Sequence, residues 1–418
     1  MLDSARRCCH GRAFLSLTMQ TVRSAVLLAS LALAATAAEP ASWGDAFSQG
    51  KVSLNARLRY EQVEQTGLLD ARARTLRTRL GFTTAKFEGL QLSAEIENVA
   101  TDDGDAYSQA GLNPGATGKA VVADPETTEL NQLWFSFTYA KSTFTVGRQK
   151  LIFDNARFVG DVGWRQNQQT FDAVVVQNKA FDKTTLTYAY LDRVNRVFSR
   201  RHAQGRWDSD SHLFNASHVV SPAATVTAYA YLLDFGNSAA NSTATYGVSV
   251  TGAQKLNDTL KVTYRAELAT QSEFGPSSLD YSALYNCFEA GLAAKEGSFT
   301  LGHELLGSDR NVGFKTPLAT LHAFNGWADL FLTTPAAGLR DVYVKGTGNL
   351  PQAVTLTAFY HWFETHKGNT DLGTEFDVMA SRKFGKYVTA TAKFADYRRE
   401  STAFPNVRKV WLQLDFVY

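Results

Sequence analysis

The sequence has little cysteine, and what it has is badly placed for disulfide formation. Two of its three cysteines, Cys8 and Cys9, lie at the extreme N-terminus, and only Cys287 lies in the rest of the chain. Residues 1–38 are predicted below to be a signal peptide, and after its removal Cys287 has no second cysteine with which to form an intrachain disulfide. The chain is therefore not built like a small secreted domain that depends on disulfides for its stability.

An excess of charge of either sign is also absent. The 418 residues carry 42 Lys and Arg against 40 Asp and Glu, which gives a formal charge of +2. This balance excludes a strongly basic nucleic-acid-binding protein. A hydrophobic content of 44%, with 12% aromatic residues, excludes a disordered chain.

Long apolar runs are absent, with one exception at residues 25–38, AVLLASLALAATAA. A spanning helix needs about 18 to 20 nearly uncharged residues, so a helical membrane protein is excluded. Arg23 precedes the run and small residues close it, which predicts a signal peptide over residues 1–38; Met19 is an alternative translation start. Residues 1–38 hold four arginines and one aspartate, so their removal leaves 38 basic and 39 acidic residues and a net charge of −1.

What the sequence does have is a repeated alternation of apolar and polar residues. In residues 51–61 one set of alternate positions is polar, and the other is Val52, Leu54, Ala56, Leu58 and Tyr60. Residues 90–97, 259–269 and 410–418 repeat this pattern. A period of two residues indicates β-strands with two unlike faces, so the chain is predicted to be all-β.

Three features favour a transmembrane barrel over a soluble sandwich. Many strands are about 10 to 14 residues long, which suits a tilted bilayer crossing. Tight turns alternate with long connections, the longest being 101–128, 150–167, 193–208 and 308–337. The final residue, Tyr418, is aromatic and ends an apolar-alternating strand, which resembles the C-terminal signature of bacterial outer-membrane barrels.

These features predict one antiparallel transmembrane β-barrel over residues 51–418, with short periplasmic turns and long extracellular loops. Counting gives 18 strands, starting near residues 51, 72, 89, 129, 143, 168, 183, 209, 223, 244, 259, 279, 298, 339, 352, 371, 388 and 406. An even count places both termini on the periplasmic side, where residues 39–50 form a short lead-in. A barrel of about 16 to 18 strands encloses an aqueous channel.

Charged residues at inward positions are the candidate pore lining. The first three strands place a basic group opposite an acidic one: Arg57, Arg59, Arg77, Arg79, Glu95 and Glu97. A later strand adds Arg265 and Glu267. Such an arrangement orients charged or sugar-like solutes, because guanidinium groups bind carboxylates bidentately. The alternative interpretation is a hydrated wall whose charges neutralise one another.

A second candidate is the connection within residues 147–172, GRQKLIFDNARFVGDVGWRQNQQTFD. Its arginines and aspartates are interleaved, which favours an ordered structure over a loose loop. Two placements remain open. The segment either folds into the lumen as a constriction or lies outside as a lid held by its own salt bridges.

The stretch GRQKLIFDNARFVGDVGWRQNQQTFDAV resembles the signature region of the alginate export family of outer-membrane proteins, and residues 316–344 are similar to a second family segment. The resemblance covers about residues 50–418. It implies an 18-stranded barrel whose lumen arginines attract a polyuronate. By motif match, it implies pore or constriction roles for Arg148, Arg157, Arg165 and Asp172. The near-neutral mature charge departs from a pore built strongly for polyanions.

Other chemistries find little support. The sequence contains no nucleophile elbow, P-loop, dinucleotide fingerprint or zinc motif. His361 and His366 are five residues apart, so on one strand they point to opposite faces. We therefore expect a non-enzyme with no cofactor, no metal site and no nucleic-acid partner.

The leading hypothesis is a passive channel in the outer membrane of a Gram-negative bacterium. It would pass anionic or polyhydroxylated solutes, including uronate oligosaccharides or polysaccharide. The alternatives are a general nutrient porin and, from another class, a barrel-embedded enzyme or an adhesin. The expected partners are the solute, outer-membrane lipid and periplasmic export or uptake components.

Overall fold

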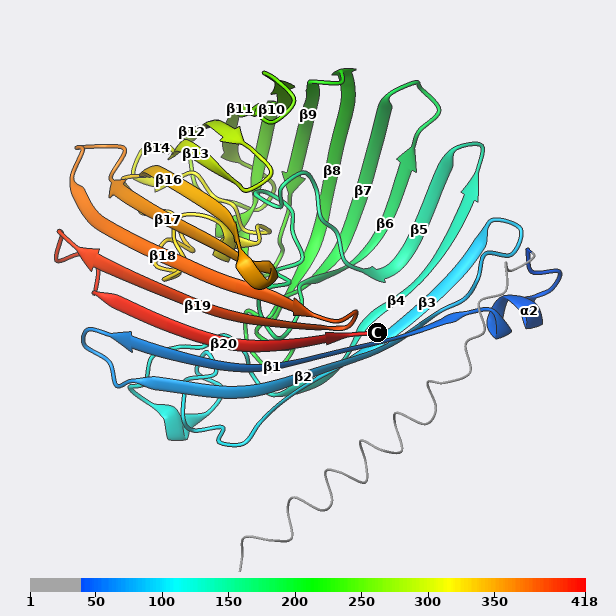
Figure 1. The fold of residues 1–418 in the computed structure, drawn as a ribbon, viewed down its shortest axis with the longest axis horizontal. Coiled ribbons are helices and arrows are strands. Elements are labelled where there is room, and N and C mark those ends of the chain that lie inside the picture. The colour runs from blue at the N-terminus through cyan, green and yellow to red at the C-terminus, as the bar shows by residue number, and fades with distance from the viewer. Residues whose placement is uncertain (1–38) are drawn as a thin grey trace, which may run out of the picture.

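The computed structural model describes residues 39–418, so the predicted signal peptide lies outside the described residues. Eighteen antiparallel strands form one closed barrel (Figure 1). The barrel closes because β1 (Lys51–Gln65) pairs with β2 (Ala71–Thr83) on one side and with β20 (Val407–Val417) on the other. The predicted all-β, 18-stranded barrel is confirmed.

The other barrel strands pair with their neighbours in chain order. They are β3 (Leu90–Thr101), β4 (Thr127–Tyr139), β5 (Ser142–Gln149), β6 (Thr170–Asn178), β7 (Thr184–Asn195), β8 (Arg206–Ser221), β9 (Ala224–Leu233), β10 (Thr243–Lys255), β11 (Lys261–Glu273), β12 (Ser282–Ala293), β13 (Gly297–Leu306), β16 (Leu339–Leu350), β17 (Val354–Glu364), β18 (Asp371–Phe384) and β19 (Val388–Arg399). Each strand begins within three residues of its predicted start. The prediction succeeds because each strand has lipid on one face and the lumen on the other.

The smaller elements lie in the connections and the lead-in. They are the α-helix α2 (Trp43–Ser48), the strands β14 (Ser308–Asp309) and β15 (Val312–Gly313), and the 3-10 helices η1 (Pro114–Ala116), η2 (Ala239–Asn241), η3 (Leu321–Ala323) and η4 (Pro351–Ala353). Helix α2 was not predicted. It packs at the short-turn end, where Phe47 stacks on Phe82 of β2 with ring centroids 6.1 Å apart. Among residues 39–418, no helix is long and apolar enough to cross a membrane.

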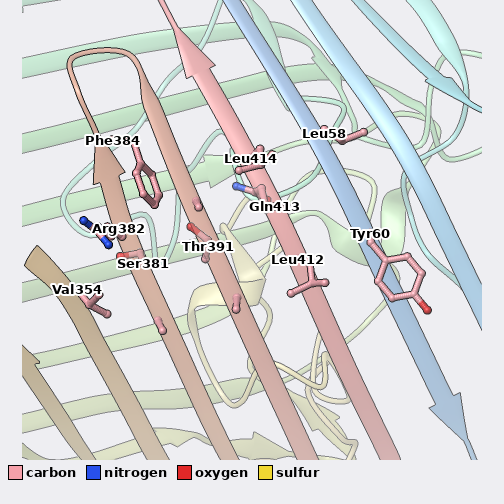
Figure 2. A pocket seen from close by; sticks show the side chains of 13 residues that line it. Leu58, Tyr60, Val354, Ser381, Arg382, Phe384, Thr391, Leu412, Gln413 and Leu414 are labelled. Carbon is pink, nitrogen blue, oxygen red and sulfur yellow. The ribbon is translucent and has the colours of Figure 1, made fainter. Parts of the chain in front are cut away.

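Alternate residues face opposite sides of the wall. On β1 the side chain of Leu58 is 54% exposed, whereas that of the adjacent Arg59 is 1% exposed. Figure 2 shows the outer face around β17–β20 and β1, where Leu58, Leu412 and Leu414 help to line an apolar groove of about 480 Å³. Apolar side chains that point away from the lumen form the lipid-facing surface of such a barrel.

The two ends of the barrel differ in their connections. At one end the turns are tight, as between β4 and β5, where Ala140 and Lys141 have φ values of 45° and 64°. Two successive residues with positive φ form the hairpin turn that matches the twist of the strands. At the other end lie the long segments 102–126, 150–169 and 307–338.

The buried apolar residues lie inside the barrel, where the long segments pack against the wall. Phe158 of segment 150–169 contacts Tyr229, Tyr285 and Phe314, with ring centroids 5.2, 5.2 and 6.0 Å away. Nearer the tight turns, the inward residues are mostly small hydroxyl residues that are at least partly exposed, such as Ser53, Ser93, Thr145, Ser217, Thr251, Thr263, Thr300 and Thr347. The lumen is therefore packed toward the long-loop end and polar toward the short-turn end.

Candidate functional site in the barrel lumen

Segment 150–169 crosses the lumen between strands on different sides of the barrel. Arg157, which is 1% exposed, forms a 2.7 Å ion pair with Glu304 of β13. Arg165 forms a 3.1 Å ion pair with Glu61 of β1. Because both partners belong to the inner wall, the structure shows the lumen placement of this segment, one of the two that the sequence left open.

Three of the four predicted arginines of β1 and β2 hold the backbone of this segment. Nη1 of Arg57 donates to the carbonyl oxygen of Gly163 at 3.1 Å. Nη2 of Arg59 donates to that of Trp164 at 2.6 Å, and Nη2 of Arg79 donates to that of Gln166 at 3.3 Å. Each arginine also meets a carboxylate; the partners are Asp415, Asp124 and Glu97. The four arginines form a basic wall, and three of them hold segment 150–169 in the lumen.

Arg77 differs from the other three. It lies directly opposite Arg57 in the register of β1 and β2 and is 1% exposed. Its Nη2 donates to the side-chain oxygen of Asn55, but Nε and Nη1 have no hydrogen-bond partner within residues 39–418. A buried guanidinium group beside a second one, with two unsatisfied nitrogens, favours an anion at this place.

The predicted acidic residues are engaged by neighbours. The carboxylate of Glu95 accepts from Asn131 at 2.6 Å, and Glu97 pairs with Arg79. On β11, Glu267 pairs with Arg265 and accepts from the hydroxyl of Tyr229 at 2.8 Å. These contacts fit the alternative interpretation, in which wall charges neutralise one another.

Two residues carried over by motif match lie on the outer face of the wall. Arg148 follows Phe144 and Val146 at alternate positions of β5, and both of these are exposed apolar residues. It pairs at 2.7 Å with Asp172, its register partner on β6. The implied constriction role of Arg148 and Asp172 is therefore wrong in geometry. The motif runs through a strand end, and strand alternation turns these two side chains away from the lumen.

Asp329 of segment 307–338 is the centre of a buried ionic cluster that the sequence did not reveal. Its carboxylate contacts Arg165 at 2.9 Å, Lys409 of β20 at 2.8 Å and His322 at 2.7 Å. Burial opposes ionisation, but His322, Lys409 and Arg165 together hold the pKa of Asp329 well below its usual range. The cluster ties both lumen segments to the wall.

His322 connects this cluster to Lys393 of β19. The ammonium group of Lys393 lies 2.6 Å from Nε2 of His322 and has only donors, so Nε2 accepts. Nδ1–H then donates to Asp329, which makes the imidazole neutral. Burial lowers the pKa of His322 well below its usual value, in agreement with this geometry. Lys393 also lies 3.4 Å from the ring centroid of Trp327 and 4.2 Å from that of Trp164.

Segment 307–338 is held to β18 by its backbone. The amides of Trp327 and Ala328 donate to Asp377 and Glu375 at 3.1 and 2.6 Å. The two histidines of the HWFETH motif are apart, but not as opposite faces of one strand: His361 contacts Asp341 inside the barrel, whereas His366 lies beyond the end of β17 and accepts from the amide of Ser308.

The alternation of the last strand already places some of these residues on the lumen side. Lys409, Trp411, Gln413 and Asp415 alternate with the apolar face of the last strand, so their inward position follows from the same period of two. Asp124, His322 and Asp329 lie in connections that have no periodicity, and only the fold brings them together.

Comparisons with known proteins agree with this architecture. A sequence model of the family described as "Alginate export" matches residues 51–272. The structure of Acinetobacter baumannii OccAB4 is similar with a TM-score of 0.71 and 13% identity, over 88% of this chain and 98% of that one. Pseudomonas aeruginosa OpdK, whose structure is titled as a complex with vanillate, is similar with a TM-score of 0.69 and 14% identity, over 89% and 99%. No protein of curated function matches the sequence.

Proposed function

This chain belongs to the alginate export family and is a β-barrel of the outer membrane of Gram-negative bacteria, and we propose that it is a channel for anionic or polyhydroxylated solutes. Uronate oligosaccharides or polysaccharide are the solute class that the proposal names. The family match and the fold together identify the chain as an outer-membrane barrel of the porin type.

The proposal rests chiefly on the unsatisfied guanidinium group of Arg77. Its guanidinium group is buried inside the barrel, opposite Arg57, with two nitrogens that no described residue satisfies. A solute carboxylate offers two acceptor oxygens in the geometry that a guanidinium fork prefers. OpdK, which shares the fold, has been solved with vanillate, a small carboxylate, and this supports a carboxylate as one solute.

Passage requires the lumen segment to yield. Arg57, Arg59 and Arg79 hold the backbone of segment 150–169 through carbonyl oxygens, and neutral acceptors bind a guanidinium group more weakly than a carboxylate does. A uronate that enters the lumen therefore competes for the same donors and displaces the segment as it binds. Charged solutes are thereby favoured over neutral ones of equal size.

Planar-bilayer conductance of the purified chain tests the proposal. We expect a steady conductance that oligouronates reduce and neutral oligosaccharides of equal length reduce less. The double variant Arg57→Ala with Arg77→Ala should lose anion preference. The matched control, Arg72→Ala with Arg74→Ala, removes two arginines from the outward face of β2 and should retain it.

The outcomes separate the alternatives. A conductance indifferent to oligouronates would favour a general nutrient porin. An unchanged anion preference in the double variant would refute the role of the basic wall. A protein that folds but does not conduct would remove the channel hypothesis and favour an adhesin or a barrel-embedded enzyme.

A further inference from the structure

The wall of the barrel has a notch at its long-loop end, between β4 and β7. Strands β5 and β6 have only 8 and 9 residues, whereas their outer neighbours β4 and β7 have 13 and 12. They stop early because the chain between them turns into the lumen. The pairing of β4 with β5 ends at Leu133, which lies opposite Arg148. Residues 127–131 of β4 therefore have no partner strand on the side of β5.

The connection between β7 and β8, residues 196–205, lies across this notch. The hydroxyl of Ser199 and the amide of Arg200 each donate to the carboxylate of Glu129 over 3.0 Å. The guanidinium group of Arg201 donates to the carbonyl oxygen of Glu126 at the start of this exposed edge. Residues 193–207, RVNRVFSRRHAQGRW, contain five arginines and no acidic residue.

A cavity of about 180 Å³ lies where this connection meets the wall. It is lined by Thr128, Glu129, Leu130, Arg148, Asn195, Arg200 and Arg206. Arg148 is paired with Asp172, but the guanidinium groups of Arg200 and Arg206 make no ion pair or hydrogen bond with the residues that the structure describes. Three guanidinium groups therefore line the cavity. The only carboxylate that lines it is that of Glu129, which already accepts hydrogen bonds from the hydroxyl of Ser199 and the amide of Arg200.

The cavity opens at the height where the apolar outer band ends. Toward the long-loop end, the outward residues of β5 change from the apolar Phe144 and Val146 to Arg148. In the same direction, those of β6 change from Val174 to Asp172. On β8, Phe214 belongs to the apolar band, and Arg206 lies at the strand's outer end. In an outer-membrane barrel, the border of the apolar band lies at the lipid–water interface, where the lipid headgroups are.

We propose that this notch binds the phosphate group of an outer-leaflet lipid. The two unpaired guanidinium groups supply forked donors that match phosphate oxygens, and Leu130 with the band below accommodates the lipid's apolar part. A lipid is favoured over a solute in transit because the lining residues Leu130 and Arg148 lie on the outward face of the wall, where their register partners Ile96 and Leu133 are exposed apolar residues. This proposal does not depend on which solute the channel passes.

Native mass spectrometry of the full chain in detergent tests the proposal, with bisphosphorylated lipid A, the same lipid without phosphates, and inorganic phosphate as probes. We expect the bisphosphorylated lipid to bind more tightly than the other two. The variant Arg200→Gln with Arg206→Gln should weaken its binding by about tenfold or more, because charge-assisted hydrogen bonds are lost.

The control is Arg72→Gln with Arg74→Gln, which removes two outward arginines of β2 that do not line this cavity. Its lipid affinity should stay within about twofold of the wild type. Because the side chains of Arg200 and Arg206 have no partner among residues 39–418, the test variant should retain wild-type conductance and heat-modifiable migration, which excludes misfolding. Equal binding of phosphorylated and dephosphorylated lipid, equal loss in both variants, or binding of inorganic phosphate alone would each overturn the proposal.

Discussion

Replacing Arg165 by glutamine is expected to free segment 150–169 from the lumen without unfolding the barrel. Arg165 pairs with Glu61 at 3.1 Å and with Asp329 at 2.9 Å, and all three side chains are at most 8% exposed. Removing one partner of a buried ion pair costs about 3 to 5 kcal/mol, because the remaining charges stay buried without compensation. The interstrand hydrogen bonds are untouched, so the segment yields before the wall does.

A penalty of that size shifts the equilibrium between packed and released segment by about two to four orders of magnitude. Single-channel conductance should therefore rise, and trypsin should cleave the folded variant near Lys150 and Arg157 while the wild type resists. The control is Arg148→Gln, because its pair with Asp172 lies outside the lumen with side chains 22% and 21% exposed. Such a pair contributes about 1 kcal/mol or less. An Arg165→Gln protein with wild-type conductance and trypsin resistance would refute this reasoning.

Two further predictions concern the same lumen contacts. Burial depresses the pKa of His322, so its contribution to segment packing is present above about pH 6.5, where the unfolded imidazole is also neutral, and is lost as the pH falls below that value. Tryptophan fluorescence, which reports Trp164 beside His322, should therefore shift between pH 7 and 5 in the wild type, and a shift of equal size in His322→Gln would contradict this origin. The Arg157–Glu304 pair should give a coupling energy of about 2 kcal/mol or more in a double-mutant cycle of urea-induced segment release, and additive effects would disprove a direct pair.

The outer-facing arginines show where pattern reasoning fails. Arg148 and Arg165 belong to one conspicuous polar stretch, and the sequence treats them alike. Arg148 lies near the end of β5, and its side chain faces outward. Arg165 lies in an irregular segment that turns into the lumen. Residue type is the same in both places, and only the local backbone path decides which side of the wall each side chain faces.

The sequence by itself determined the barrel. Its period of two, its strand lengths and its alternation of tight and long connections follow from the requirement that every strand separates lipid from a polar lumen. That requirement is local, so Leu58 and Arg59 reveal it without reference to any distant residue.

Only the tertiary structure decided how the lumen is filled. Asp329 meets Arg165 across 164 positions of chain and Lys409 across 80, and no periodicity relates them. These contacts form because a closed ring of strands brings its long connections into one confined space, where buried charges must find partners. The wall is therefore encoded residue by residue, while the packing of the lumen arises from the closure of the barrel as a whole.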